Sequence, residues 1–294
     1  MKEATVLKKI AIGYAVISAL LYAIYTPAAK VIGISCPPAL LTAYLYLGSG
    51  IGLGILYLLF RRRFDHGEKS VGREDVKDLA MVVVLNVTAG ILLNIGIDLS
   101  SAVSMSLVGN FEIVATSIIA LWFGEKISHR LWAGIIVVFL ASLVLSFDLK
   151  NLTISWGIIF GLLATVCWGL ENNFTKKLSV KNPIQVVIVK GLGVGIGSYL
   201  VSWIIKEHQV GWQLTLWCLV LGFFAFGLSI LMYVIAQRYL GAAKTSAYYA
   251  ISPFLSVIIS IIFLREKITI QFIVALVLMV VGIGIVVKDS LASE

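Results

Sequence analysis

Three ionisable residues stand inside otherwise apolar stretches of this 294-residue sequence: Glu112, Glu171 and Lys190. A charge in such a stretch is costly unless it faces a cavity or a partner, and groups of this kind commonly bind ions, protons or substrates. No basic residue lies near Glu112 in its stretch, so we expect it to bind a cation or to exchange a proton. The alternative is a neutral, hydrogen-bonded structural carboxyl that shares Asn110.

Glu171 and Lys190 fall in consecutive apolar stretches that a short loop joins. At about 1.5 Å per helical residue, both lie roughly 10 Å from the same end of their helices. Antiparallel neighbours would therefore bring the two charges together as an ion pair. The alternative is a cavity wall whose pairing changes with substrate or proton. Asn172 and Asn173 follow Glu171 directly, and we expect one of them to point inward as a hydrogen-bonding group.

Aromatic rings are the other candidates for a cavity lining, because ring faces attract cations. The alternative for each ring is ordinary packing or anchoring at the membrane interface. The candidates are Tyr22, Tyr25, Trp168, Tyr248 and Tyr249.

Metal and cofactor sites are not expected. His66, His129 and His208 lie in loops without ligand partners, and the three cysteines have neither metal-like spacing nor the pattern of a disulfide framework. Two glycine-rich runs, "GSGIGLG" and "GLGVGIG", lie inside apolar stretches with no preceding strand. Their spacing therefore predicts close helix contacts and no nucleotide-binding loop.

The composition defines the elements that must position these residues. With 60% hydrophobic residues, 13% charged residues and a mean hydropathy of +1.02, the chain has too much apolar surface for a water-soluble domain. The apolar runs have the length of membrane-spanning helices, about 20 residues each. We predict an all-α integral membrane protein with ten spans, at residues 10–32, 38–60, 77–97, 101–123, 130–147, 154–177, 184–205, 213–236, 243–264 and 270–287.

The basic residues predict the orientation, because loops rich in lysine and arginine stay in the cytoplasm. Of the 23 basic residues, 17 fall on the side of the termini, five fall on the other side, and Lys190 lies within a span. Both termini are therefore expected in the cytoplasm, in a multi-pass protein of the cytoplasmic (inner) membrane. The net charge of +8 fits anionic membrane lipids as neighbours and needs no nucleic acid. We expect a monomer or a weak homodimer.

The sequence also repeats itself, in order, at offsets of 141 to 146 residues. The matching stretches are "LYAIYTPAAK" with "CWGLENNFTK", "GSGIGLG" with "GLGVGIG", and "GEKIS" with "REKIT". The first five spans therefore match the last five, over residues 1–150 and 151–294. Because five is odd, the second half is inserted upside down relative to the first. Such inverted repeats are typical of secondary transporters, whose substrate site lies between the repeats.

These paired motifs and the ten spans resemble the drug/metabolite transporter superfamily, EamA type. The resemblance implies transport of a small organic solute, such as an amino acid, an amine or a drug-like compound. Export coupled to protons or to a gradient is the expected direction, and uptake of a cationic or zwitterionic solute is the alternative. The family usually carries a proline in the fourth helix of each half. Pro253 fits, but Glu112 takes the equivalent place in the first half.

Two other classes of function are less consistent with the sequence. A membrane-embedded enzyme of lipid metabolism would need a catalytic cluster near one interface, and no cluster of His, Asp and Ser is present in the sequence. A purely structural protein would leave the charges in apolar stretches unexplained.

Overall fold

The computed structural model describes residues 2–33, 35–64, 68–122, 128–148, 153–249, 251–265 and 268–292. Glu125 and Glu266, which mark the repeated motif in each half, lie outside these described residues. Eight elements make up the first half of the chain: α1 (Lys2–Tyr22), α2 (Tyr25–Gly33), α3 (Pro38–Phe64), η1 (Arg73–Asp75), α4 (Val76–Leu99), α5 (Ala102–Val108), α6 (Phe111–Trp122) and α7 (His129–Ser146).

A short antiparallel ribbon joins the halves, with Phe147 opposite Ile154 and Asp148 opposite Thr153. It was not expected in an all-α chain. The remaining elements are β1 (Phe147–Asp148), β2 (Thr153–Ile154), α8 (Trp156–Leu178), α9 (Pro183–Ile204), α10 (Trp212–Gly222), the π-helical turn η2 (Phe223–Leu228), α11 (Ser229–Leu240), α12 (Ala242–Tyr249), α13 (Ile251–Leu264) and α14 (Ile270–Ala292).

The all-α membrane fold is confirmed, and every predicted span contains one helix or a run of consecutive helical segments. Among the described residues, five helical units are long and apolar enough to cross a membrane by themselves: Lys9–Gly33, Pro38–Phe60, Arg73–Leu99, Pro183–Ile204 and Trp212–Leu240. The count of ten crossings remains a prediction. Large apolar side chains such as Leu58, Trp203 and Phe263 are at least 70% exposed, as lipid-facing groups should be.

Within the described residues, three of the predicted spans are interrupted, at residues 23–24, at residues 109–110 and at the π-helical turn η2, which the apolar pattern alone did not predict. Proline explains the first interruption, because it cannot bond to the carbonyl four residues earlier and its ring clashes there. Pro27 accounts in this way for the break between α1 and α2. The helix also stops between α5 and α6, at Gly109 and Asn110, where no proline is present.

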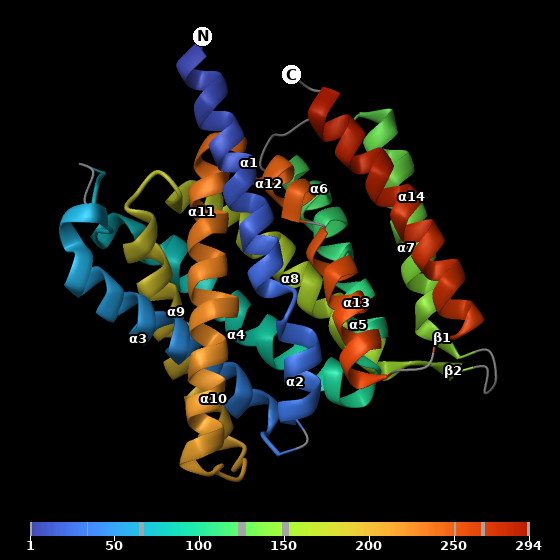
Figure 1. The fold of residues 1–294 in the computed structure, drawn as a ribbon, viewed down its shortest axis with the longest axis horizontal. Coiled ribbons are helices and arrows are strands. Elements are labelled where there is room, and N and C mark those ends of the chain that lie inside the picture. The colour runs from blue at the N-terminus through green and yellow to red at the C-terminus, as the bar shows by residue number, and fades with distance from the viewer. Residues whose placement is uncertain are drawn as a thin grey trace.

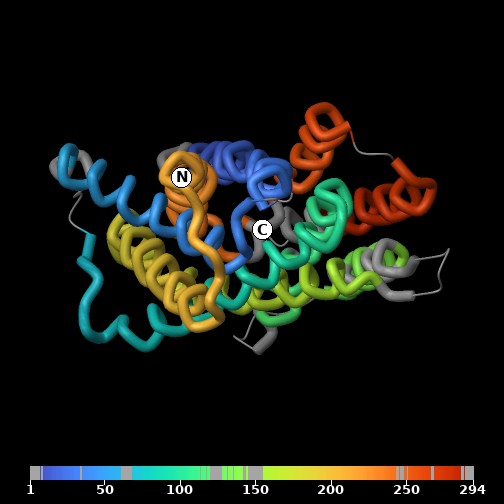
Figure 2. The backbone as a smooth tube through the Cα atoms, turned by 90° about the horizontal axis from the view of Figure 1, so that it is seen from below, coloured from blue at the N-terminus to red at the C-terminus, as the bar shows by residue number. Residues whose placement is uncertain are grey.

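Packing joins helices from opposite halves (Figures 1 and 2). Helix α3 packs along α9, α4 along α8, α1 along α11, and α7 along α14. In Figure 1, α7 and α14 form one edge of the molecule, and α3 and α9 lie toward the opposite edge. Helix α1 begins and α14 ends at the same end of the molecule. The chain therefore returns to the side where it started.

Charged side chains connect the loops next to α4 and α9. The Lys181 ammonium lies 2.8 Å from a Glu74 oxygen and 2.9 Å from an Asp75 oxygen. The hydrogen bond to Glu74, and after it the one to Asp75, raises the pKa of Lys181. Arg238, at the end of α11, lies 2.6 Å from Glu68 and donates to the Ser179 carbonyl oxygen at 2.7 Å. These bonds fix the ends of α4, α8 and α11 relative to one another.

Glycines allow the backbones of α3 and α9 to approach closely. A Cβ atom added to Gly191 would lie 2.6 Å from the backbone nitrogen of Gly50, and one added to Gly50 would lie 2.7 Å from the nitrogen of Leu192. These distances are too short for nonbonded atoms, and backbone atoms cannot rotate aside as side chains do. The glycine runs are thus helix contacts, as their spacing predicted.

Replacing these glycines tests the contact. Gly50→Ala and Gly191→Ala should each force α3 and α9 apart and lower the midpoint of thermal unfolding, because overpacking typically costs about 1–3 kcal/mol. Gly54→Ala is the matched control on α3, since nothing lies within 4 Å of its added Cβ. Equal melting of all three variants in detergent would contradict the close contact.

Candidate functional site

A chamber of about 50 Å³ lies where the helices of the two halves face each other. Because one water needs about 10–15 Å³ on this measure, the chamber has room for roughly three to five waters. In this structure the chamber therefore has space for little more than water. The chamber is lined by Ser18, Tyr22, Tyr46, Asn86, Glu112, Trp168, Glu171, Asn172, Thr175, Lys190, Phe226, Ser229, Ile230, Tyr233 and Tyr249. We call it the main chamber.

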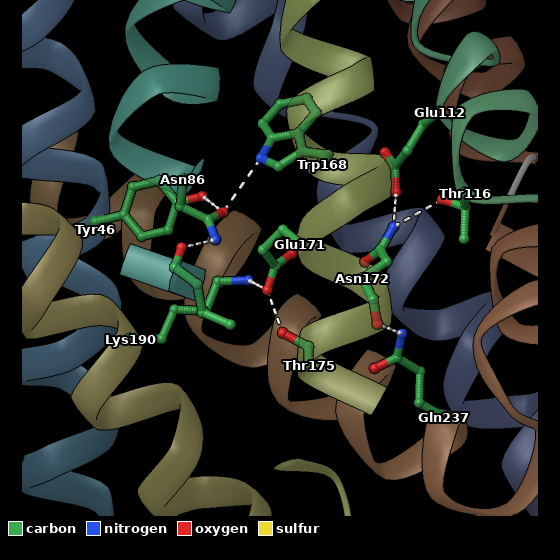
Figure 3. Close-up of polar contacts among 11 residues, drawn as sticks. Tyr46, Asn86, Glu112, Thr116, Trp168, Glu171, Asn172, Thr175, Lys190 and Gln237 are labelled. Carbon is green, nitrogen blue, oxygen red and sulfur yellow. Dashed lines mark hydrogen bonds and ion pairs between the residues drawn. The ribbon is translucent and has the colours of Figure 1, made fainter. Parts of the chain in front are cut away.

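Helix α8 supplies four of the lining residues and runs through the middle of the site (Figure 3). Trp168, Glu171, Asn172 and Thr175 recur at intervals of one, three and four residues, which places them along one side of the helix. Figure 3 shows Glu171 pointing toward Lys190 and Asn172 toward Glu112. One helix therefore holds both acidic residues in place.

The predicted ion pair between Glu171 and Lys190 is present. The Lys190 Nζ lies 3.1 Å from the Glu171 Oε1, and the two side chains are 5% and 3% exposed. The Thr175 hydroxyl donates to the same oxygen. The carboxylate thus has a cation and a hydrogen-bond donor, which offset the cost of burying it.

Glu112 is held in a different way. Its Oε1 accepts a hydrogen bond of 2.7 Å from the Asn172 amide, and that amide also lies 3.3 Å from the Thr116 hydroxyl. Within the described part of the chain, Glu112 makes no ion pair, although Lys190 lines the same chamber. The alternative in which Glu112 shares a hydrogen bond with Asn110 was wrong, because neither polar atom of the Asn110 side chain has a hydrogen-bond partner among the described residues. Glu112 is therefore the carboxyl of the chamber without a bound cation.

The two asparagines after Glu171 divide as expected. Asn172 reaches the chamber, whereas the Asn173 amide donates to the Gly169 carbonyl at 2.9 Å and is not part of the lining. Gln237, from α11, lies 3.5 Å from the carbonyl oxygen of Asn172. Asn173 is thus a structural group of α8.

A polar cluster that the sequence analysis missed forms the opposite wall. The Asn86 side-chain oxygen accepts from the Tyr46 hydroxyl at 2.8 Å and from the Trp168 indole at 3.2 Å. The Asn86 amide donates to the Val82 carbonyl at 2.7 Å. Figure 3 shows this cluster beside Glu171. An asparagine within an apolar span was the available signal, but nothing in the sequence pairs it with a tyrosine 40 residues away.

The aromatic candidates divide into two groups. Tyr22, Trp168 and Tyr249 line the main chamber, and the Tyr22 ring lies 5.7 Å from that of Tyr249 and 6.4 Å from that of Trp168. Tyr25 is buried outside the lining, and its hydroxyl donates to Asn94 at 2.6 Å. Tyr248 is also outside the lining. The rings of Tyr22 and Tyr25 nevertheless lie 5.4 Å apart, and both contact Phe226. What distinguishes Tyr25 is that Asn94 accepts the hydrogen bond of its hydroxyl.

A second, smaller chamber of about 30 Å³ adjoins the first. We call it the outer chamber. It shares Tyr22, Glu112, Trp168 and Tyr249 with the main chamber and is otherwise lined by Thr26, Leu93, Met105, Ser106, Gly109, Asn110, Ser252, Pro253 and Ser256. Asn110 thus belongs to this second chamber. Among the described residues, no group of three or more His, Cys, Asp or Glu is placed to hold a metal ion.

Comparisons with known proteins identify the fold and the family. The EamA-like transporter family matches residues 9–147 and again residues 155–288. An uncharacterized transporter of Methanothermobacter thermautotrophicus is 25% identical over 276 residues, which cover 87% of this chain and 80% of that protein. A crystal structure that is 17% identical superposes with a TM-score of 0.69 over 97% of this chain and 99% of the other, which supports the fold. The chain is a multi-pass membrane transporter that belongs to the EamA-like transporter family.

Proposed function

We propose that the protein is a secondary transporter that moves a small organic solute by alternating access, with the main chamber as its solute site. The observation that carries this proposal is the meeting of Glu112, Glu171 and Lys190 in one buried chamber between the two halves. Ionisable groups so placed commonly bind substrates or coupling ions. The chain lacks a nucleotide-binding motif, so an ion or solute gradient is the energy source that we propose.

The charges favour a particular kind of solute. Lys190 balances Glu171, whereas Glu112 has no cation beside it, so the ionised chamber carries one excess negative charge. A cationic or zwitterionic solute would complement this charge, and the rings of Tyr22, Trp168 and Tyr249 offer faces to its cationic group. The same carboxyl can hold a proton when no solute is bound. Exchange of a proton for such a solute drives export, and the reverse exchange would serve uptake.

The proposed mechanism depends on the inverted repeat, because the two halves must move relative to each other. The separate family matches to the two halves support it, although the boundary near residue 150 remains our proposal. Under the proposed correspondence, α3 and α9 are equivalent, as are α7 and α14, and each pair packs together. The contact of α1 with α11 likewise repeats that of α4 with α8. Such a pair of halves can rock about the chamber and expose it to each side in turn.

The proposed orientation places both termini in the cytoplasm. In a cysteine-free variant, single cysteines at Asp148 and His208 should react with a membrane-impermeant maleimide in intact cells, and a cysteine at Lys69 should not. His208 and Lys69 are exposed and suit labelling, whereas Glu207 accepts hydrogen bonds from the first turn of α3 and is unsuitable. External labelling at Lys69 in intact cells would reverse the orientation.

The ion pair predicts a stability cycle. Glu171→Gln leaves the Lys190 charge buried without its partner and should destabilise the protein, since breaking a buried pair typically costs about 3–5 kcal/mol. Adding Lys190→Met should restore most of the melting temperature. Asp78→Asn is the control, because its ion pair with Lys177 is 3.9 Å long and well exposed. A double variant that melts at as low a temperature as Glu171→Gln alone would show that an unpaired Lys190 charge is not the cause of the destabilisation.

Glu112→Gln tests the coupling role. Amines and amino acids would first be screened against the purified protein by thermal shift and then by counterflow in liposomes. The variant should lose gradient-driven accumulation and the pH dependence of binding, because its amide exchanges no proton near neutral pH. Its melting temperature should stay near that of the wild type, since the amide oxygen can still accept from Asn172. Normal accumulation with an unchanged pH profile would remove Glu112 from the mechanism.

A further inference from the structure

The outer chamber lies beyond the main chamber, toward the end of the molecule away from the termini. Along α1, which starts at the end of the termini, Ser18 lines the main chamber and Tyr22 lines both. Thr26, the next lining residue along the chain, belongs to the outer chamber alone. A layer of three rings, Tyr22, Trp168 and Tyr249, therefore separates the chambers, and Glu112 borders both.

Two polar side chains of the outer chamber are buried without hydrogen-bond partners. Asn110 and Ser252 are each 1% exposed, and among the described residues the Asn110 amide nitrogen, the Asn110 amide oxygen and the Ser252 hydroxyl have no hydrogen-bond partner. Their neighbours in the same lining are satisfied, since the Ser106 and Ser256 hydroxyls lie 2.9 Å apart in a shared hydrogen bond. Unpaired polar groups at this depth are costly, so they indicate a ligand.

The chemistry of these atoms selects the ligand. Asn110 needs both an acceptor for its amide nitrogen and a donor for its amide oxygen. A bare cation would satisfy only the oxygen atoms and would leave the amide nitrogen unpaired. Water supplies both functions, and the volume of about 30 Å³ has room for roughly two or three waters. Buried waters typically make about three hydrogen bonds each, which the groups of this chamber can provide.

We propose that the outer chamber is a hydrated antechamber, in which waters held by Asn110 and Ser252 connect Glu112 with the end of the molecule opposite the termini. Protons reach and leave Glu112 by this route, while the solute occupies the main chamber on the other side of the rings. The proposal rests on the proposed coupling role of Glu112. It adds to that role a proton path through the outer chamber, separate from the solute site in the main chamber.

Other titratable groups surround Glu112 and must be considered in any pH dependence. They are Tyr22 from α1, Tyr46 from α3, Glu171 from α8, Lys190 from α9, Tyr233 from α11 and Tyr249 from α12. Helix α7 also packs on α6, and it has no titratable residue between Leu131 and Ser146. Among the described residues that line the outer chamber, Glu112 is the carboxyl, and it lines this chamber together with Asn110 and Ser252.

The first test uses the sign of a stability change. If the outer chamber is hydrated, Ser252→Ala removes a bonded hydroxyl and should leave the melting temperature unchanged or lower it. If the chamber is dry, the same change removes an unpaired polar group and should raise the melting temperature. Ser198→Ala is the matched control, because Ser198 is also buried with an unpaired hydroxyl but lines neither chamber. An increase for Ser252→Ala as large as that for Ser198→Ala would overturn the proposal.

The second test follows the proton itself, without any solute. The infrared carboxyl band that Glu112→Gln removes would be recorded in acidic buffer during transfer of the purified protein from H₂O to D₂O. Ser252→Val and Asn110→Leu fill the antechamber and should slow deuterium exchange of this band by about tenfold or more, because they break the hydrogen-bonded chain of waters. Wild type and Ser198→Ala should exchange at one common, faster rate.

Unchanged exchange in both filling variants, with wild-type helix content, would place the proton route elsewhere and overturn the antechamber. If either variant fails to fold, Ser252→Ala replaces it in the same measurement, since the loss of one hydroxyl should still slow exchange. The result is independent of transport. Failure of the proposed function would show as normal coupled transport by Glu112→Gln, whatever the exchange rates of the antechamber variants.

Discussion

Burial of charge in an interior surrounded by lipid is the constraint on which the arrangement of the site depends. A carboxylate or an ammonium group placed there needs a partner, a hydrogen bond or water. Glu171 has both Lys190 and Thr175 as partners, whereas among the described residues the Glu112 carboxyl has the Asn172 amide as its hydrogen-bond partner and borders two chambers. The two acids therefore have different chemistry available to them. Glu171 is compensated within the protein, and Glu112 is the carboxyl that we propose to respond to a proton or a solute.

The rest of the fold keeps this difference in place. Helix α8 carries Glu171 and Asn172 side by side, and the close contact at Gly50 and Gly191 holds α3 against α9, from which Lys190 projects. Breaks in the helices occur at the level of the chambers, between α1 and α2 and between α5 and α6. Interrupted helices are common around transporter sites because they bring polar backbone and side chains to the middle of the membrane. The close glycine contacts thus hold α3 against α9 beside the site, whereas the helix interruptions lie at the chambers themselves.

Much of this arrangement was predictable from the sequence, and the reasons differ from residue to residue. The ion pair of Glu171 and Lys190 followed from helix length and a short loop, which are local properties. The surroundings of Glu112 were not predictable, because Asn172 comes from the other half of the chain and the two residues are 60 positions apart. Tyr25 was a candidate for the lining, but its hydroxyl donates to Asn94, a residue 69 positions away that no local pattern pairs with it. The Tyr46 and Asn86 pair depends on the approach of α3 to α4, which no local pattern encodes.

In the mechanism that we propose, a proton and the solute compete for Glu112. The most direct measurement is the release of protons when solute is added to the purified protein in weakly buffered detergent solution, followed with a pH indicator dye. We expect the wild type to release protons in proportion to the solute bound and Glu112→Gln, at saturating solute, to release none. Solute binding to the wild type without proton release, or equal release by the variant, would contradict it.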